Sequence, residues 1–151
     1  MQDAVSTRTP VHLWIVGILS LLWGCFGAYD YTMSHMRDVQ YIGSSMPGVD
    51  PNAALAWMDG FPIYAKIGWG LGVWGGLLGA ILLLIRSRYA VWAFAASMVG
   101  VVLSIGWQLA AAPPLAGADT GAAKVIPFVV IAVGLFQLWY SWTMEKKGVL
   151  R

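Results

Sequence analysis

The stretch "LLWGCFGAYDYTM", residues 21–33, decides the fold because it supports two opposite interpretations. It holds the only cysteine, Cys25, behind an apolar run that starts near His12, and it holds the first acid after that run, Asp30. The segment is either a secretory signal that is cut before a lipid-carrying cysteine, or the outer end of a permanent membrane helix. The choice fixes how many times the chain crosses a bilayer.

The residues around the cysteine favour a permanent helix. Residues 22–25 (LWGC) resemble a lipoprotein cleavage box, but Trp23 stands where a small residue is usual, and Phe26 stands where a polar residue is usual. The apolar run continues to Tyr29, so it has the length of about 20 residues that a membrane crossing needs. We therefore predict that the segment stays in the membrane and that Cys25 fills a gap in a helix interface.

The composition indicates an integral membrane protein. Hydrophobic residues make up 59% of the 151 residues and charged residues only 11%, whereas an ordinary soluble domain is about 25% charged. The nine tryptophans suit the interfacial belts of a membrane protein. The nine Lys and Arg residues are too few for nucleic-acid binding. The lipid bilayer is therefore the predicted surrounding of one small domain.

Four apolar runs are long enough to cross a bilayer as helices. Helices are required because unpaired backbone groups cost several kcal/mol each in hydrocarbon. Segments such as GAILLLI, residues 79–85, do not alternate as the strands of a membrane barrel do. The predicted fold class is an all-α integral membrane protein, a single bundle of four transmembrane helices. The expected spans are residues 12–29, 61–85, 90–111 and 125–142.

Prolines and acids mark the predicted helix boundaries. We expect Asp59 to cap the second span with Pro62 in its first turn, and Pro127 to lie in the first turn of the fourth. The third span should stop before Pro113, and residues 86–89 should form a tight hairpin between the second and third spans.

The long connection between the first two spans contains a further helix. Residues 50–58 (DPNAALAWM) combine an Asp50 cap, Pro51 at the first position and enough apolar residues for a short periplasmic helix lying at the interface. Residues 31–41 are expected to extend the first helix beyond the membrane.

Charges differ between the two sides of the predicted bundle. One side carries the basic residues Arg8, Arg86, Arg88, Lys146, Lys147 and Arg151. The other side carries Arg37 and Lys124 together with the acids Asp30, Asp38, Asp50, Asp59 and Asp119. By the positive-inside rule, we predict that both termini and the hairpin face the cytoplasm, in a bacterial inner membrane.

Two ridges of glycine run along the second span. Small residues four positions apart let helices approach closely in lipid, where association depends on packing and polar contacts. We expect packing within the bundle; a homo-oligomer seam or a contact with another membrane protein is the alternative. The ridges are Gly68, Gly72 and Gly76, and beside them Gly75 and Gly79. The expected partners are Gly17, Gly24, Gly27, Gly100 and Ser104.

Polar residues gather near the outer ends of the predicted spans. Lys66 is the cation within a span, about one turn from the outer end, and we expect it to pair with Asp30 or Asp59. The cluster either anchors the bundle at the interface or forms a binding site open to the periplasm. Its predicted members are Asp30, Tyr31, His35, Arg37, Asp59, Lys66 and Gln108.

The sequence contains no pattern typical of an enzyme, a metal site or a cofactor site. His12 and His35 are expected on opposite sides of the membrane, so they cannot share a metal ion or a haem, and no Cys/His spacing suits zinc. No glycine-rich loop follows a strand to hold phosphate. We therefore predict that the protein is not an enzyme and has no catalytic, cofactor-binding or metal-ligating residues.

Several motifs occur together in an order that resembles a known family. They are WGCFGAYDYTM (residues 23–33), FP (residues 61–62), VWGGLLGAILLLIRSRYAV (residues 73–91) and KKGVLR (residues 146–151). The pattern resembles a group of small four-span inner-membrane proteins of proteobacteria, which are sometimes loosely labelled sugar transporters. The resemblance covers nearly the whole chain. It implies four spans in a bacterial inner membrane, and it implies no catalytic or binding residues.

Two functions fit this predicted fold. An accessory, assembly or interaction subunit of a membrane complex needs only lipid-embedded helices, a glycine ridge and an exposed loop, all of which the sequence predicts. A small-solute transporter that acts as an oligomer is the alternative. Four helices are few for alternating access, and transport folds generally place their site at the midplane between two repeats. The accessory subunit is therefore the preferred prediction.

Overall fold

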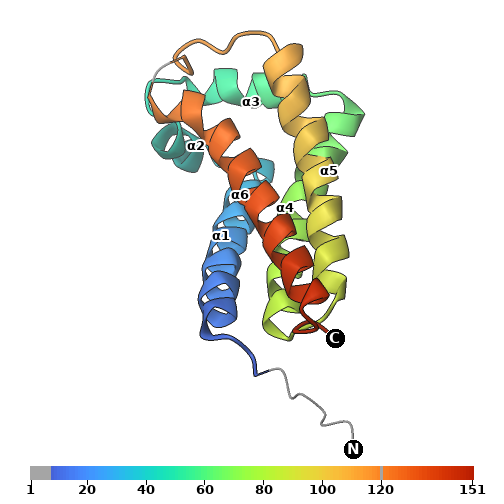
Figure 1. Ribbon diagram of the computed structural model, residues 1–151. Helices are drawn as coiled ribbons and strands as arrows, with labels where there is room; N and C mark the ends of the chain where they lie inside the picture. The colour runs from blue at the N-terminus through green and yellow to red at the C-terminus, as the bar shows by residue number, and fades with distance from the viewer. Residues whose placement is uncertain (1–7, 120) are drawn as a thin grey trace, which may run out of the picture.

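The computed structural model describes residues 8–119 and 121–151, and this part of the chain is helical without any strand (Figure 1). Its helices are α1 (Val11–His35), α2 (Val39–Ser45), α3 (Pro51–Asp59), α4 (Ile63–Leu84), α5 (Tyr89–Ala110) and α6 (Ala122–Lys146). Four of them, α1, α4, α5 and α6, are long and apolar enough to cross a membrane. The predicted all-α bundle of four spanning helices is thereby confirmed.

The predicted limits hold to within two residues for α4 and α5, whereas α1 and α6 are longer than predicted, and α6 continues to Lys146 instead of ending at residue 142. α1 continues to His35 instead of ending at residue 29. α6 begins at Ala122, so Pro127 lies inside the helix and not in its first turn. Proline removes only one main-chain hydrogen bond, and the two alanines and the lysine before it have high helix propensity, so the helix can start ahead of it. The third span ends at Ala110, before the prolines, as predicted.

The short helix between the first two spans has the predicted cap. The Asp50 side chain accepts a hydrogen bond from the Ala53 amide at 3.0 Å, and Pro51 occupies the first helical position of α3. The predicted cap of α4 is wrong, because Asp59 is the last residue of α3. Pro62 precedes α4 without a side-chain cap, and its fixed φ suits a helix start.

The end of α1 also differs from the prediction of an extension to residue 41. The chain turns at Arg37, which has a left-handed φ of 58°. The Arg37 amide donates to Ser34 O and the Asp38 amide donates to Met33 O, a pattern that closes a helix C-terminus. Asp38 then caps α2 by accepting from the Tyr41 amide at 2.8 Å. α2 is therefore a separate helix.

The glycine ridges of α4 pack against α5. A side chain at Gly68 would place its Cβ 2.8 Å from the Gly100 carbonyl oxygen, and one at Gly79 would meet the Phe94 ring at 2.7 Å. The Ser97 hydroxyl donates to the Gly72 carbonyl at 2.6 Å across the same interface. The other two ridge members, Gly75 and Gly76, also face α5 at Ser97.

These contacts confirm the expectation that the ridges pack within the bundle. α4 and α5 form the most extensive helix pair of the structure. A homo-oligomer seam through the same glycines would require α5 to leave α4, because α5 already covers them.

α1 packs on a second face of α4. Gly17 faces the Leu84 side chain and Gly24 faces Leu77, so two of the predicted glycines contact α4, although not at its ridges. Gly27 has no such neighbour within 4 Å. Cys25 is exposed, which contradicts its predicted place in a helix interface. Consecutive helix residues point about 100° apart, so Cys25 leaves the buried stripe that contains Gly24.

The four spans form a row in which α1 packs on α4, α4 on α5 and α5 on α6. The first and last members meet where His12 Nδ1 and Tyr140 OH form a hydrogen bond. This contact lies at the terminal end, which we define as the end that carries the α4–α5 hairpin and the tail, residues 147–151 (Figure 1). A core of residues from all four spans fills this end, and its largest members are Leu13, Leu83, Phe94, Tyr140 and Met144.

The opposite end, the cap end, is covered by α2, α3 and the connection between α5 and α6 (Figure 1). A second, smaller core holds these segments together. Trp57 of α3 donates its indole N–H to the Pro113 carbonyl at 2.9 Å, which ties α3 to the α5–α6 connection. The buried members of this core are Ile42, Val49, Ala54, Leu55 and Leu115.

Candidate functional site

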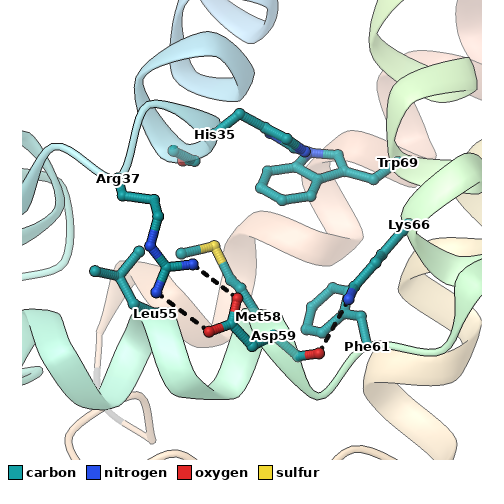
Figure 2. A pocket seen from close by; sticks show the side chains of 9 residues that line it. His35, Arg37, Leu55, Met58, Asp59, Phe61, Lys66 and Trp69 are labelled. Atoms are coloured by element: carbon teal, nitrogen blue, oxygen red, sulfur yellow. Dashed lines mark hydrogen bonds and ion pairs between the residues drawn. The ribbon is translucent and has the colours of Figure 1, made fainter.

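A small hollow lies at the cap end between the end of α1, α3 and the start of α4 (Figure 2). Its volume is about 210 Å³. Four of the seven predicted cluster residues line it: His35, Arg37, Asp59 and Lys66. They come from α1, from the α1–α2 turn, from α3 and from α4, so the fold collects polar groups that are up to 31 positions apart in the sequence.

Five lining residues were missing from the predicted cluster, namely Ser34, Leu55, Met58, Phe61 and Trp69. Helical spacing could have found three of them. Trp69 follows Lys66 by three residues, Leu55 precedes Asp59 by four and Ser34 follows Tyr31 by three, so each shares a helix face with a predicted member. Phe61 reaches the hollow only because the chain reverses after α3.

Arg37 and Asp59 form a two-pronged ion pair across the hollow. Arg37 Nη1 donates to Asp59 Oδ1 at 2.8 Å and Nη2 donates to Oδ2 at 3.2 Å (Figure 2). The hydrogen bond from Arg37 holds the pKa of Asp59 below its usual value, with a smaller contribution from the charge of Lys66. Both side chains are more than half exposed, so solvent screens the pair and its contribution to stability is small.

Lys66 contacts Asp59, one of its two predicted partners, but not through the carboxylate. Its ammonium donates to the main-chain carbonyl of Asp59 at 3.0 Å, and no ion pair with either predicted carboxylate occurs among the described residues (Figure 2). The carboxylate of Asp30 instead accepts a hydrogen bond from Tyr41 OH at 2.8 Å. The predicted ion pairs are wrong because both carboxylates bind other side chains. Asp59 binds Arg37, and Asp30 binds Tyr41.

The bond between Tyr41 and Asp30 connects α2 to α1 beside the hollow. Burial, the hydrogen bond to Asp30 and the charge of that carboxylate together raise the pKa of Tyr41 to about 12, and burial makes the largest contribution. Tyr41 also contacts Tyr29 of α1, ring edge to ring face, with centroids 5.4 Å apart. Asp30 therefore links α2 to α1 and does not line the hollow.

A row of aromatic rings runs from α1 across the hollow to α5. Tyr31 stacks on His35 with centroids 4.0 Å apart, and His35 faces Trp69 at 5.2 Å. Phe61 lies 6.3 Å from Trp69 and 4.7 Å from Trp107 of α5. The His35 Nδ1 atom contacts the Tyr31 carbonyl at 2.9 Å, which fixes the orientation of the imidazole. Three members of the row, His35, Phe61 and Trp69, line the hollow together with its charged groups (Figure 2).

The last predicted member, Gln108, lies apart from the hollow. Its amide donates to the Ser104 hydroxyl at 3.3 Å, one turn earlier on α5. The predicted cluster thus separates into three parts. His35, Arg37, Asp59 and Lys66 form the hollow, Asp30 and Tyr31 pack beside it, and Gln108 bonds within its own helix.

A second concave surface lies on the face of the bundle between α5 and α6. This groove has a volume of about 410 Å³, and every residue that lines it is apolar. Five of its lining residues belong to α5 and Leu138 belongs to α6. The buried residues of α6 are Gln137, Tyr140, Ser141 and Met144, and none of residues 123–136 is buried. The groove is lined by Ala95, Met98, Val99, Val102, Leu103 and Leu138.

Neither surface contains a cluster of metal ligands among the described residues. Among residues 8–119 and 121–151, no three His, Cys, Asp or Glu side chains gather as metal ligands. No protein-family model, no curated protein and no solved structure matches the chain. The family resemblance of the motifs therefore stays a prediction, and the site is interpreted from its own geometry. The four apolar helices make the chain a multi-pass membrane protein.

Proposed function

We propose that the chain is an accessory or interaction subunit of a membrane complex, without catalytic activity of its own. The observation that carries the proposal is the apolar groove between α5 and α6, together with the unpacked first half of α6. A helix of a partner protein is the ligand that such a groove fits, since a helix can fill an apolar groove with its side chains. We propose that the complex lies in a bacterial inner membrane.

Helix association in lipid depends on how well surfaces fit, because lipid tails are as apolar as leucine side chains. The groove offers a concave apolar surface of α5 bordered by Leu138 of α6, and it offers flexible packing residues such as Met98. In the same chain, the closely fitting glycine surface of α4 is already used by α5. The α5–α6 face is therefore the one where a partner helix would gain most from packing.

The interior gives little support for the transporter alternative. The buried polar residues of the described chain are all uncharged, and they are Ser20, Ser97, Ser104, Gln137 and Ser141. Transport sites generally lie at the midplane, where broken helices expose backbone groups to the solute. Here α4 and α5 are unbroken, and the charged hollow lies at the cap end.

The orientation proposed from the charges agrees with the arrangement of the terminal end. The Arg88 amide donates to the Arg151 carbonyl at 3.0 Å, and the Arg151 amide donates to Arg86 O at 2.8 Å, so hairpin and tail lie side by side. Their basic residues therefore concentrate at one end of the bundle, which supports a cytoplasmic location for that end.

Photo-crosslinking in native membranes tests the proposed function. A photoreactive phenylalanine analogue at Val102, in the groove, should give one crosslinked protein of defined mass, whereas the analogue at Ile18, on the exposed face of α1, should not. Ala95→Trp, which fills the groove, should abolish the crosslink. Crosslinks to lipid alone, or equal crosslinks from both positions, would contradict the proposal. Solute uptake by proteoliposomes of the purified chain, lost in Lys66→Gln, would favour the transporter instead.

A further inference from the structure

We propose that the hollow at the cap end binds a phosphate-bearing anion, with Lys66 as the cation that contacts it. The phosphate belongs either to the headgroup of an anionic lipid or to a soluble phosphate ester, and both present the same chemistry to the hollow. The site is separate from the α5–α6 groove, so the inference does not depend on the proposed partner.

The charge balance of the hollow favours an anion. Two cationic side chains, Arg37 and Lys66, face one carboxylate, Asp59. Both oxygens of that carboxylate are engaged by Arg37. Lys66 contacts the uncharged Asp59 carbonyl and forms no direct ion pair with the carboxylate, so the hollow holds one more positive than negative side chain. A negatively charged group would complete the balance, whereas a cation would find no free carboxylate.

Hydrogen-bond donors remain available in the same place. The Lys66 ammonium has three N–H groups, and the contact with the Asp59 carbonyl uses one of them. The guanidinium of Arg37 has five, of which two point at Asp59 (Figure 2). Phosphate oxygens are strong acceptors for such groups, since hydrogen bonds between ionised partners are about twice as strong as neutral ones.

The size and surroundings of the hollow suit a headgroup better than a whole metabolite. Its volume of about 210 Å³ is below the range of about 300–1,000 Å³ typical of pockets that enclose a complete small ligand. The rings of Trp69 and Phe61 form its apolar wall. Aromatic rings of this kind gather at headgroup depth in membrane proteins. A phosphate in the hollow could therefore keep its glycerol and acyl chains outside, against the bundle.

Lipid titration of the purified full chain, read by native mass spectrometry, tests the proposal. We expect phosphatidylglycerol to bind more tightly than zwitterionic phosphatidylcholine, and to bind Lys66→Gln about tenfold more weakly than wild type, since one charge-assisted hydrogen bond is commonly worth that factor. Lys66→Arg should retain binding. Lys124→Gln is the matched control, because it removes the same charge from an exposed position on α6, outside the hollow.

A competition experiment with a soluble phosphate ester distinguishes the two sources of phosphate. If glycerol 3-phosphate displaces phosphatidylglycerol and raises the thermal midpoint of wild type but not of Lys66→Gln, the ligand is a free phosphate ester. If it does neither while phosphatidylglycerol still depends on Lys66, the ligand is a lipid headgroup. Equal lipid binding by wild type, Lys66→Gln and Lys124→Gln, or no preference for phosphatidylglycerol, would overturn the proposal.

A second variant covers the case in which Lys66→Gln does not fold. Ser34→Phe places a ring in the hollow and changes no charge. It should weaken phosphatidylglycerol binding as Lys66→Gln does, because it occupies the same space. Unchanged binding by a folded Ser34→Phe variant would show that the lipid sits elsewhere and would contradict the proposal.

Discussion

At the scale of single residues, two arginines adopt the left-handed backbone conformation that glycine usually adopts after the end of a helix. Arg37 and Arg86 have φ of 58° and 61°, and each follows the last turn of a spanning helix, where the left-handed conformation ends α1 and α4. Each side chain also forms a contact that glycine could not provide. Arg37 binds Asp59, and Arg86 Nε donates to the Val149 carbonyl at 3.3 Å. Each of the two arginines thus both reverses the chain and forms a tertiary contact.

Tyr41 leads to a prediction about pH at the same scale. Its pKa in the folded chain is raised to about 12, above the value of about 10 in an unfolded chain. The contribution to stability is therefore complete below pH 10 and is lost as the pH rises from 10 to 12. Thermal unfolding at pH 9 and pH 11.5 should show a smaller loss of stability for Tyr41→Phe than for wild type.

Tyr64→Phe is the control for this measurement, because Tyr64 is an exposed tyrosine at the start of α4. It should keep the pH dependence of wild type. If Tyr41→Phe loses as much stability as wild type between the two pH values, the hydrogen bond from the Tyr41 hydroxyl to Asp30 does not stabilise the contact between α2 and α1.

At the scale of elements, the α4–α5 pair depends on the absence of side chains on both helices. A Cβ at Gly100 would lie 2.5 Å from the Gly68 carbonyl oxygen and from the Gly72 amide nitrogen. Both groups belong to the backbone of α4, so the two helices would have to separate. We expect Gly100→Ala to destabilise the protein by about 1–3 kcal/mol, the usual cost of overpacking. Thermal or denaturant unfolding in detergent measures this loss.

Gly106 on the same helix provides the matched control. A Cβ there meets nothing within 4 Å, and alanine is the better helix former by about 1 kcal/mol. Gly106→Ala should therefore leave stability unchanged or increase it. Equal destabilisation by the two substitutions would show that the close approach of α4 and α5 does not decide their effect.

The elements themselves were largely predictable, because each follows from local physical chemistry. Apolar length predicted the four spans, and the Asp50-Pro51 pair predicted α3. The ends of α1 and α4 were harder, since Arg37 and Asp59 are compatible with several local structures until the fold selects one. The hollow was predictable only in part. His35, Arg37, Asp59 and Lys66 share a side of the membrane, but which of them pair depends on the reversal at Arg37.

At the scale of the whole molecule, the proposed orientation predicts which surfaces reagents reach. In a chain with Cys25→Ala, a charged maleimide added to cells with an open outer membrane should label Ser44→Cys, on exposed α2. It should label Ser87→Cys, in the α4–α5 hairpin, only after the inner membrane is permeabilised. The reverse pattern would place the terminal end outside the cell and would contradict the positive-inside assignment.

The packing of α6 at the terminal end has a mechanical consequence for a molecule in a fluid bilayer. α6 is held by the core at the terminal end, while the connection that precedes it is tied to α3 by the bond between Trp57 and Pro113. A helix fixed mainly at one end can change its tilt at small cost when the hydrocarbon layer becomes thicker or thinner. We expect such a change of tilt to leave the α4–α5 pair in place, because the glycine contacts between these two helices do not involve α6.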